Sequence, residues 1–167
     1  MKLIKFPESK VKELLSWIKN EEDKQFWSGN TFQKGLTREV FLFHLQRKDL
    51  NPFAFIGDDG SLDCYGEIVN PGENKGVLCR VIVNPAIRRK GIGKTFIKEI
   101  LHWSFNQKKM NLITLNTFGH NKPARTCYQS LGFIEVALKK NYRKVGDYWR
   151  DLIVMEKRNR NNRNKIL

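Results

Sequence analysis

The sequence lacks the features that would place it at a membrane. Among its 167 residues, no apolar run approaches the roughly 18 residues that a helix needs to cross a bilayer. The opening residues, MKLIKFPESK, reach charged side chains too early for a secretory signal peptide. We therefore expect a cytoplasmic protein that makes no use of a membrane.

Cysteine is scarce, and its placement argues against a disulfide-bonded secreted protein and against a metal-binding protein. The three cysteines, Cys64, Cys79 and Cys127, are odd in number and far apart, and none has the spacing of a zinc or iron site. Such thiols are typical of a reducing compartment. We expect an intracellular protein with free cysteines and no bound metal.

Acidic residues are also in deficit, with 17 Asp and Glu against 31 Lys and Arg, for a net charge of +14. Five of the basic residues and no acid lie in the last segment, KRNRNNRNKIL. This segment has no apolar periodicity, so we predict a disordered tail at 157–167 after a single domain at 1–156. The tail has the charge for a weak contact with RNA or a ribosome, and it is equally compatible with a solvated terminus.

Hydrophobic periodicity predicts a domain that mixes helices and strands. Residues Val11, Leu14, Leu15 and Ile18 indicate one helix, which NEEDKQFWSGN would end, and a second helix would start after Thr37. The strands expected next are PFAFIG, SLDCYGEIV and VLCRVIV, followed by a helix at about 93–107, strand NLITLNT, helix KPARTCYQSL and strands FIEVALKK and YWRDLIVM. A helix between VLCRVIV and NLITLNT requires these two strands to be parallel. The fold class is α/β or α+β with a mixed sheet.

The stretch RRKGIGKTF combines four basic residues with two glycines where a strand passes into a helix. A nucleotide P-loop would need glycine at position 88, which is Arg88, and a dinucleotide fingerprint would need glycine where Phe96 stands. The remaining pattern, R-x-x-G-x-G, places free amides of a helix N-terminus beside fixed positive charge. It favours a pyrophosphate held without a metal, although an ordinary turn with solvated basic residues would look the same.

A second motif, NKPARTCYQSLGF, places Asn121 seven residues before Tyr128. Seven residues are two helical turns, so the two side chains would share one helix face about 10 Å apart. This spacing suits a long, thin ligand that lies beside the helix.

Together, VIVNPAIRRKGIGK and NKPARTCYQSLGF resemble the GNAT superfamily of acetyl-CoA-dependent N-acetyltransferases, with a likeness from about Phe53 to Met155. The segment LLSWIKNEEDKQFWSG is similar to the opening of the branch with ribosomal-protein and aminoglycoside acetyltransferases. The resemblance implies a GNAT-like fold with six or seven mostly antiparallel strands, about four helices and a central parallel pair that splays apart.

The resemblance also implies where coenzyme A would bind. Its pyrophosphate would rest on the loop formed by Arg88, Arg89, Lys90, Gly91, Ile92, Gly93 and Lys94. The backbone of Val81 and Val83 would pair with the pantetheine arm, Asn121 would bond to that arm, and Tyr128 would stand near the sulfur. No metal would take part.

The reaction implied is attack of an amine on the thioester carbon. The amide of Val81 would stabilise the carbonyl oxygen, and Tyr128 would give its proton to the leaving thiolate. Glu67 is the first candidate for the general base and for contact with the acceptor, unless Arg80 pairs with it across the hairpin and weakens it as a base. His120 and His44 are further candidates, and Trp27 is expected to line the acceptor site.

These inferences predict an N-acetyltransferase that acts on a protein N-terminus or a small amine, as a monomer or homodimer. Two alternatives stay open at this point. One is a ribosome- or RNA-associated module, although the basic residues lie in one loop and one tail rather than in a stripe with stacking aromatics. The other is a coenzyme-A-binding protein without turnover.

Overall fold

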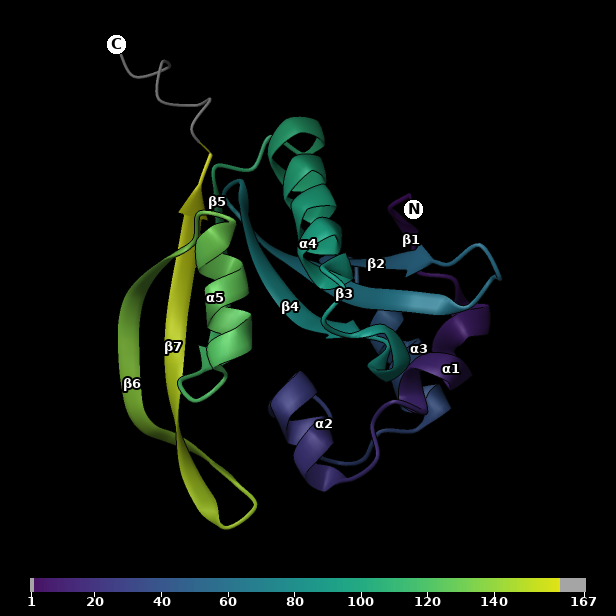
Figure 1. Cartoon of the computed structure of the whole chain (residues 1–167), viewed down its shortest axis with the longest axis horizontal. Helices are drawn as coiled ribbons and strands as arrows, with labels where there is room; N and C mark the ends of the chain where they lie inside the picture. The colour runs from purple at the N-terminus through teal and green to yellow at the C-terminus, as the bar shows by residue number, and fades with distance from the viewer. Residues whose placement is uncertain (1, 160–167) are drawn as a thin grey trace.

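A computed structural model describes residues 2–159 and shows one sheet with helices on both of its faces (Figure 1). Its seven strands are β1 (Ile4–Lys5), β2 (Leu50–Ile56), β3 (Leu62–Gly72), β4 (Lys75–Val83), β5 (Leu112–Phe118), β6 (Ile134–Val145) and β7 (Tyr148–Arg158). They lie in the order β1-β2-β3-β4-β5-β7-β6, and every neighbouring pair is antiparallel except β4 and β5. The predicted mixed sheet with one parallel pair is confirmed.

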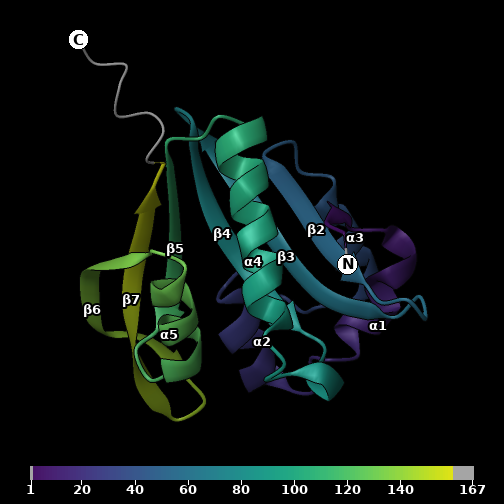
Figure 2. The ribbon, with the colours of Figure 1, turned by 45° about the horizontal axis from the view of Figure 1, so that its top comes forward.

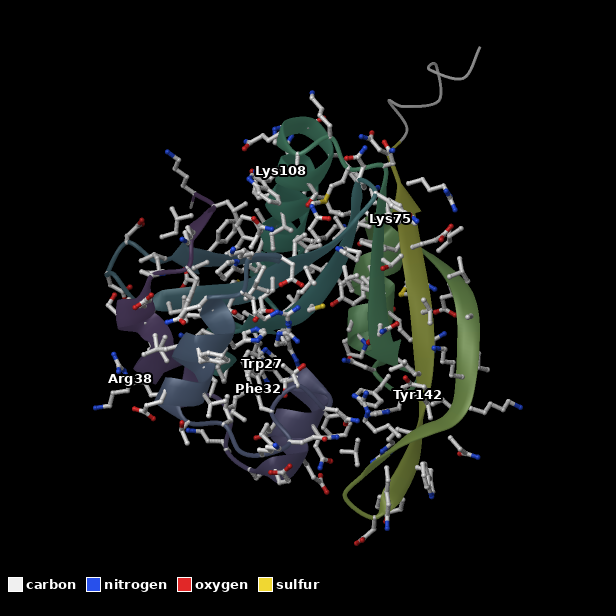
Figure 3. All side chains as sticks on the ribbon, turned by 180° about the vertical axis from the view of Figure 1, so that it is seen from behind. Trp27, Phe32, Arg38, Lys75, Lys108 and Tyr142 are labelled. Atoms are coloured by element: carbon white, nitrogen blue, oxygen red, sulfur yellow. The ribbon has the colours of Figure 1, made fainter. Side chains whose placement is uncertain are left out.

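Two layers of helices enclose the sheet. Helices α4 (Ile92–His102) and α5 (Lys122–Ser130) lie on one face, and α1 (Val11–Leu15), α2 (Glu21–Ser28) and α3 (Arg38–Leu45) lie on the other, as the view from behind shows (Figure 3). Short turns are added by η1 (Glu8–Lys10), η2 (Pro85–Ile87) and the π-helical η3 (Trp103–Gln107). Each layer has its own apolar core, and within residues 2–159 no helix is long and apolar enough to cross a bilayer.

The N-terminal helices differ from the prediction in one respect that matters for the site. The expected first helix stops at Leu15, before Ile18, and the segment NEEDKQFWSGN forms α2 instead of ending a helix. Asn20 starts α2, because its side-chain oxygen accepts the Asp23 amide at 2.8 Å, and three acidic residues follow in the first turn. The predicted loop is therefore a helix, so residues 2–159 contain five α-helices where about four were expected.

Along β3, the apolar residues Leu62, Cys64 and Ile68 alternate with Asp63, Tyr65 and Glu67, and both sets are buried. Asp63, Tyr65 and Glu67 are only 9%, 0% and 0% exposed. The face that carries them lies under the second helical layer, where Tyr65 packs with Phe6 and Phe41. Polar groups on this face must find partners inside the protein.

The central parallel pair opens along its length. Residues Lys75–Leu78 of β4 pair with Leu112–Leu115 of β5, and the register ends there, after which the strands diverge (Figure 2). Beyond that point β4 also leaves its register with β3, and Arg80 takes a φ of +50°, which is rare outside glycine. β4 therefore has a bulge just past the last residues that pair with β5.

The C-terminal boundary also shifts slightly. Strand β7 continues through Arg158, beyond the domain end predicted at 156. Residues 160–167, which make up most of the predicted tail, lie outside the described residues.

Candidate active site

The loop Arg88–Lys94 leads into an uncapped helix. Gly91 precedes α4 with a φ of +77°, and no side chain caps the first turn. The amides of that turn have no intrahelical acceptor, and the turn contains no acidic residue. Arg88, Arg89 and Lys90 are exposed next to it. Free N–H groups, the positive end of the helix dipole and three fixed cations together suit an anionic group.

Close packing holds this loop against the end of β4. A Cβ atom at Gly93 would stand 2.9 Å from Cγ2 of Val83, so glycine allows α4 to begin directly beside the strand. The Arg88 Nε donates to the Val83 carbonyl at 3.2 Å. The structure thus brings the predicted loop residues together at the end of β4.

The bulge of β4 is tied to α2 by one hydrogen bond. The Trp27 Nε1 donates to the carbonyl oxygen of Arg80 at 2.8 Å. This carbonyl shares a peptide unit with the amide of Val81, and no peptide bond in residues 2–159 is cis. In a trans peptide the C=O and N–H point in opposite directions. The indole therefore fixes the Val81 amide so that its N–H points away from Trp27.

A buried polar network lies beneath the bulge, centred on Glu67. Its carboxylate accepts hydrogen bonds from Tyr65 at 2.5 Å and from Nε of Arg80 at 2.6 Å, and Nε2 of His44 lies 3.1 Å away. Arg80 also donates to Thr31 at 3.0 Å. Glu67 is completely buried, yet three partners satisfy it.

The network determines the charge of Glu67. Burial alone would raise the pKa of Glu67, but hydrogen bonds from His44 and Arg80 hold it below its usual value. The carboxylate stays ionised and is a weak base. Its burial and its three partners also argue against direct proton transfer from an incoming amine.

Helix α5 has Asn121 at its N-cap and contains Tyr128. The Asn121 side-chain oxygen caps the helix through the Ala124 amide at 3.3 Å, which leaves its NH₂ group as a donor. The Tyr128 ring packs edge-on against Phe133, with centroids 5.8 Å apart. Burial, together with the Cys127 and Cys79 thiols, raises the pKa of Tyr128 above its usual 10, so the phenol is protonated at neutral pH. Tyr128 packs against the same apolar core as Val81, which lies just past the last β4 residue that pairs with β5.

Helix α2 connects the two diverging strands. Trp27 bonds to the bulge of β4. The centroid of the Phe26 ring lies 5.2 Å from that of Phe118, the last residue of β5, and 5.3 Å from that of His120, which follows β5. In Figure 3 the labelled Trp27 and Phe32 lie between α2 and the sheet. Burial and the charge of Arg150 lower the pKa of His120, so its imidazole is neutral at physiological pH.

Sequence reasoning missed part of this surface. It did not name Phe118, and it placed the basic residues in one loop and one tail. The β6–β7 hairpin carries a third basic group interleaved with exposed aromatic rings, in the order Lys139, Lys140, Tyr142, Arg143, Lys144, Tyr148, Trp149 and Arg150. The segment KKNYRKVGDYWR contained this signal. Two surface hollows of about 340 and 590 Å³ lie elsewhere and include none of the predicted site residues.

Known proteins share this sequence pattern and this fold. The family model described as "Acetyltransferase (GNAT) family" matches residues 12–133. The ribosomal protein bS18-alanine N-acetyltransferases of Escherichia coli K12 and Shigella flexneri are 26% identical over 82 residues, which is 49% of this chain and 55% of each relative. The chain therefore spans about half the length of the curated relatives it matches.

Solved structures extend the similarity to nearly the whole chain. Spermidine N-acetyltransferase from Vibrio cholerae, in complex with CoA and spermine, superposes with a TM-score of 0.81 at 17% identity, covering 94% of both chains. Ribosomal-protein-alanine N-acetyltransferase from Brucella melitensis gives a TM-score of 0.76 at 18% identity, covering 95% of this chain and 100% of that one. At such identities the likeness establishes the fold.

Proposed function

The chain belongs to the acetyltransferase (GNAT) family, and from this we propose that it transfers an acetyl group from acetyl-CoA to a primary amine. The observation that carries the proposal is the uncapped N-terminus of α4, which follows β4 where β4 leaves its parallel partner. The pyrophosphate of the donor would lie on the amides of Arg89 to Lys94, with Arg88 beside it. The residues present fit this anion because the helix start is basic, exposed and free of acids.

The rest of the donor would extend between the diverging strands. Past Leu78, the edge of β4 no longer pairs with β5, so the backbone of Val81 and Val83 can pair with the pantetheine arm. The NH₂ group of Asn121 is a donor to that arm. The hydroxyl of Tyr128 then lies on the sulfur side of the thioester.

In the proposed reaction a neutral amine attacks the thioester carbonyl carbon, the C–S bond breaks, and the sulfur takes a proton from Tyr128. The proton that the amine nitrogen loses then returns through water to the phenolate of Tyr128, which restores the acid. The N–H of Val81 stabilises the oxygen as it gains negative charge, and Tyr128 supplies the proton to the sulfur. Removing one such oxyanion donor from other enzymes costs about 3 kcal/mol. Glu67 is a positioning residue that does not touch the substrate. It binds Arg80 and so holds the bulge that presents the Val81 amide.

Calorimetry and an activity screen test the proposal on the full chain. Coenzyme A should give saturable heat, and acetyl-CoA should release thiol in the presence of at least one amine from a panel of amino acids, N-terminal peptides, polyamines and aminoglycosides. Absence of heat would contradict the donor site. Heat without thiol release from any acceptor would instead indicate a coenzyme-A-binding protein without turnover.

Trp27→Phe should lower kcat about tenfold, because it removes one hydrogen bond that fixes the Val81 amide. An aromatic ring remains at position 27, so the KM for acetyl-CoA should change less than about twofold. Steady-state kinetics with saturating acceptor would measure kcat and this KM separately. Trp103→Phe is the matched control, since that ring packs on Phe53 away from the site. An equal loss in both variants would show that Trp27 acts only through stability.

A further inference from the structure

Arg150 is a cation without a matching anion. It lies on β7, with its guanidinium carbon 5.9 Å from the Phe26 ring and 5.1 Å from the Tyr148 ring. Its Nε is buried and has no hydrogen-bond partner among residues 2–159. None of the ion pairs found in this part of the chain includes Arg150. Arg80, which also lies near α2, contrasts with Arg150 because Glu67 neutralises its charge.

A second arginine increases the positive charge at this position. Arg143 on β6 pairs directly across from Arg150, and side chains at opposite positions share one face of the sheet. The Arg143 guanidinium lies against Gly29, where a Cβ would be 2.3 Å from its Nη1. Gly29 ends α2, and a helix C-terminus favours a cation. Arg143 therefore lies at the negative end of a helix, whereas Arg150 contacts two aromatic rings and forms no ion pair among residues 2–159.

The charge of Arg150 lies on the side where the acceptor amine would arrive. Phe26, which packs on Arg150, also contacts Phe118 and His120 at the end of β5. Phe26 therefore lies against both Arg150 and His120. The next residue of α2, Trp27, contacts the bulge of β4. Arg150 thus belongs to the surface that spans the two diverging strands.

We propose that Arg150 binds a carboxylate of the acceptor, so the acceptor is an amine that also carries a carboxylate. This inference rests on the proposed function and names its substrate class. The planar guanidinium suits a carboxylate because it can donate two parallel hydrogen bonds, and the aromatic rings of Phe26 and Tyr148 hold it in place. A polycationic acceptor would meet like charge from both arginines.

Matched pairs of acceptors test whether a carboxylate is preferred, and they distinguish an α-carboxylate from an acidic side chain. One pair is a free amino acid and its amide, and the other is a short peptide with Asp or Asn after its free N-terminus; spermidine is the polycation. In each productive pair the carboxylate should raise kcat/KM about tenfold or more, since hydrogen bonds to charged groups are worth that much. Preference within the first pair indicates an α-carboxylate, and preference within the second indicates an acidic side chain.

Variants assign the preference to Arg150. Arg150→Gln should raise the KM for the carboxylate acceptor about tenfold and leave the uncharged partner and acetyl-CoA unaffected, whereas Arg150→Lys should keep part of the preference. Arg38→Gln removes the same charge from an exposed position on α3, far from β7 in Figure 3, and should change nothing. Thermal melting checks that each variant is folded.

Two results would overturn the inference while the proposed function stands: faster turnover of spermidine than of any carboxylate acceptor, or an unchanged preference in Arg150→Gln. If Arg150→Gln does not fold, the wild-type protein still decides the question. Equal kcat/KM within both acceptor pairs would then overturn the inference. Lack of thiol release with every acceptor would contradict the proposed function itself.

Discussion

Replacing Tyr128 by phenylalanine is expected to lower kcat about 100-fold, since a positioned general acid contributes roughly 10²–10⁴. The ring would remain packed on Phe133, and only the hydroxyl would be lost. The pKa of Tyr128 lies above its usual range, so the phenol holds its proton across neutral pH and can give it to a thiolate. The KM for acetyl-CoA should stay nearly constant, and steady-state kinetics with saturating acceptor would measure both constants.

Tyr142→Phe is the matched control for this change. Tyr142 is 46% exposed on β6, and loss of its hydroxyl should not alter kcat. A leaving group that needs no proton offers a second check: an acetyl thioester of a more acidic thiol should reduce the difference between Tyr128→Phe and wild type. If Tyr128→Phe kept full kcat while chemistry limited the rate, Tyr128 would have no part in proton transfer.

The elements of the proposed donor site could be predicted from sequence because their residues are nearly consecutive. Arg88 to Lys94 form one strand-to-helix turn, and Asn121 and Tyr128 lie on one short helix. Gly91 takes a φ of +77°, and a Cβ at Gly93 would stand 2.9 Å from Val83, so the two glycines reflect local backbone geometry. The parallel pairing of β4 and β5 followed from the helix between them.

The acceptor side depends on contacts between distant residues, and local patterns do not encode these. Trp27 bonds to Arg80 across 53 positions of the chain, and His44 contacts Glu67 across 23. Alternation along β3 separated two faces correctly but could not show that helices cover both. The ion pair of Glu67 with Arg80 was one of two alternatives, and only the structure decides that it forms.

Helix α2 could not be predicted from sequence for a different reason. Its sequence, EEDKQFWS, has little apolar periodicity, so the prediction ended a helix there. Asn20 and the acidic first turn stabilise it locally, while the Phe26 and Trp27 rings fasten it to strands that come much later in the chain. Contacts with distant strands thus contribute to its helical state, and the proposed acceptor surface depends on them.

Glu67→Ala is expected to destabilise the fold by about 3–5 kcal/mol, because it leaves the Arg80 charge buried without a partner. Tyr65 and His44 would lose a partner as well. Urea unfolding at pH 7 would measure the loss, and kcat should also fall because the β4 bulge is no longer held. Glu73→Ala, which breaks an exposed pair with Lys75, is the matched control and should leave the unfolding midpoint unchanged.

The sign of the pH dependence provides an independent test of this role. The folded-state pKa of Glu67 is lower than its ordinary value of 4.5, so its stabilisation is fully present above pH 4.5 and is lost as pH falls through the lower folded value. The difference between wild type and Glu67→Ala should therefore be constant near neutrality and shrink only in that acidic range. A combined Glu67→Ala and Arg80→Met variant should recover part of the stability, since it removes the uncompensated charge. A difference that vanished already between pH 6 and 7, or no recovery in the combined variant, would mean that Glu67 is held by something other than its ion pair with Arg80.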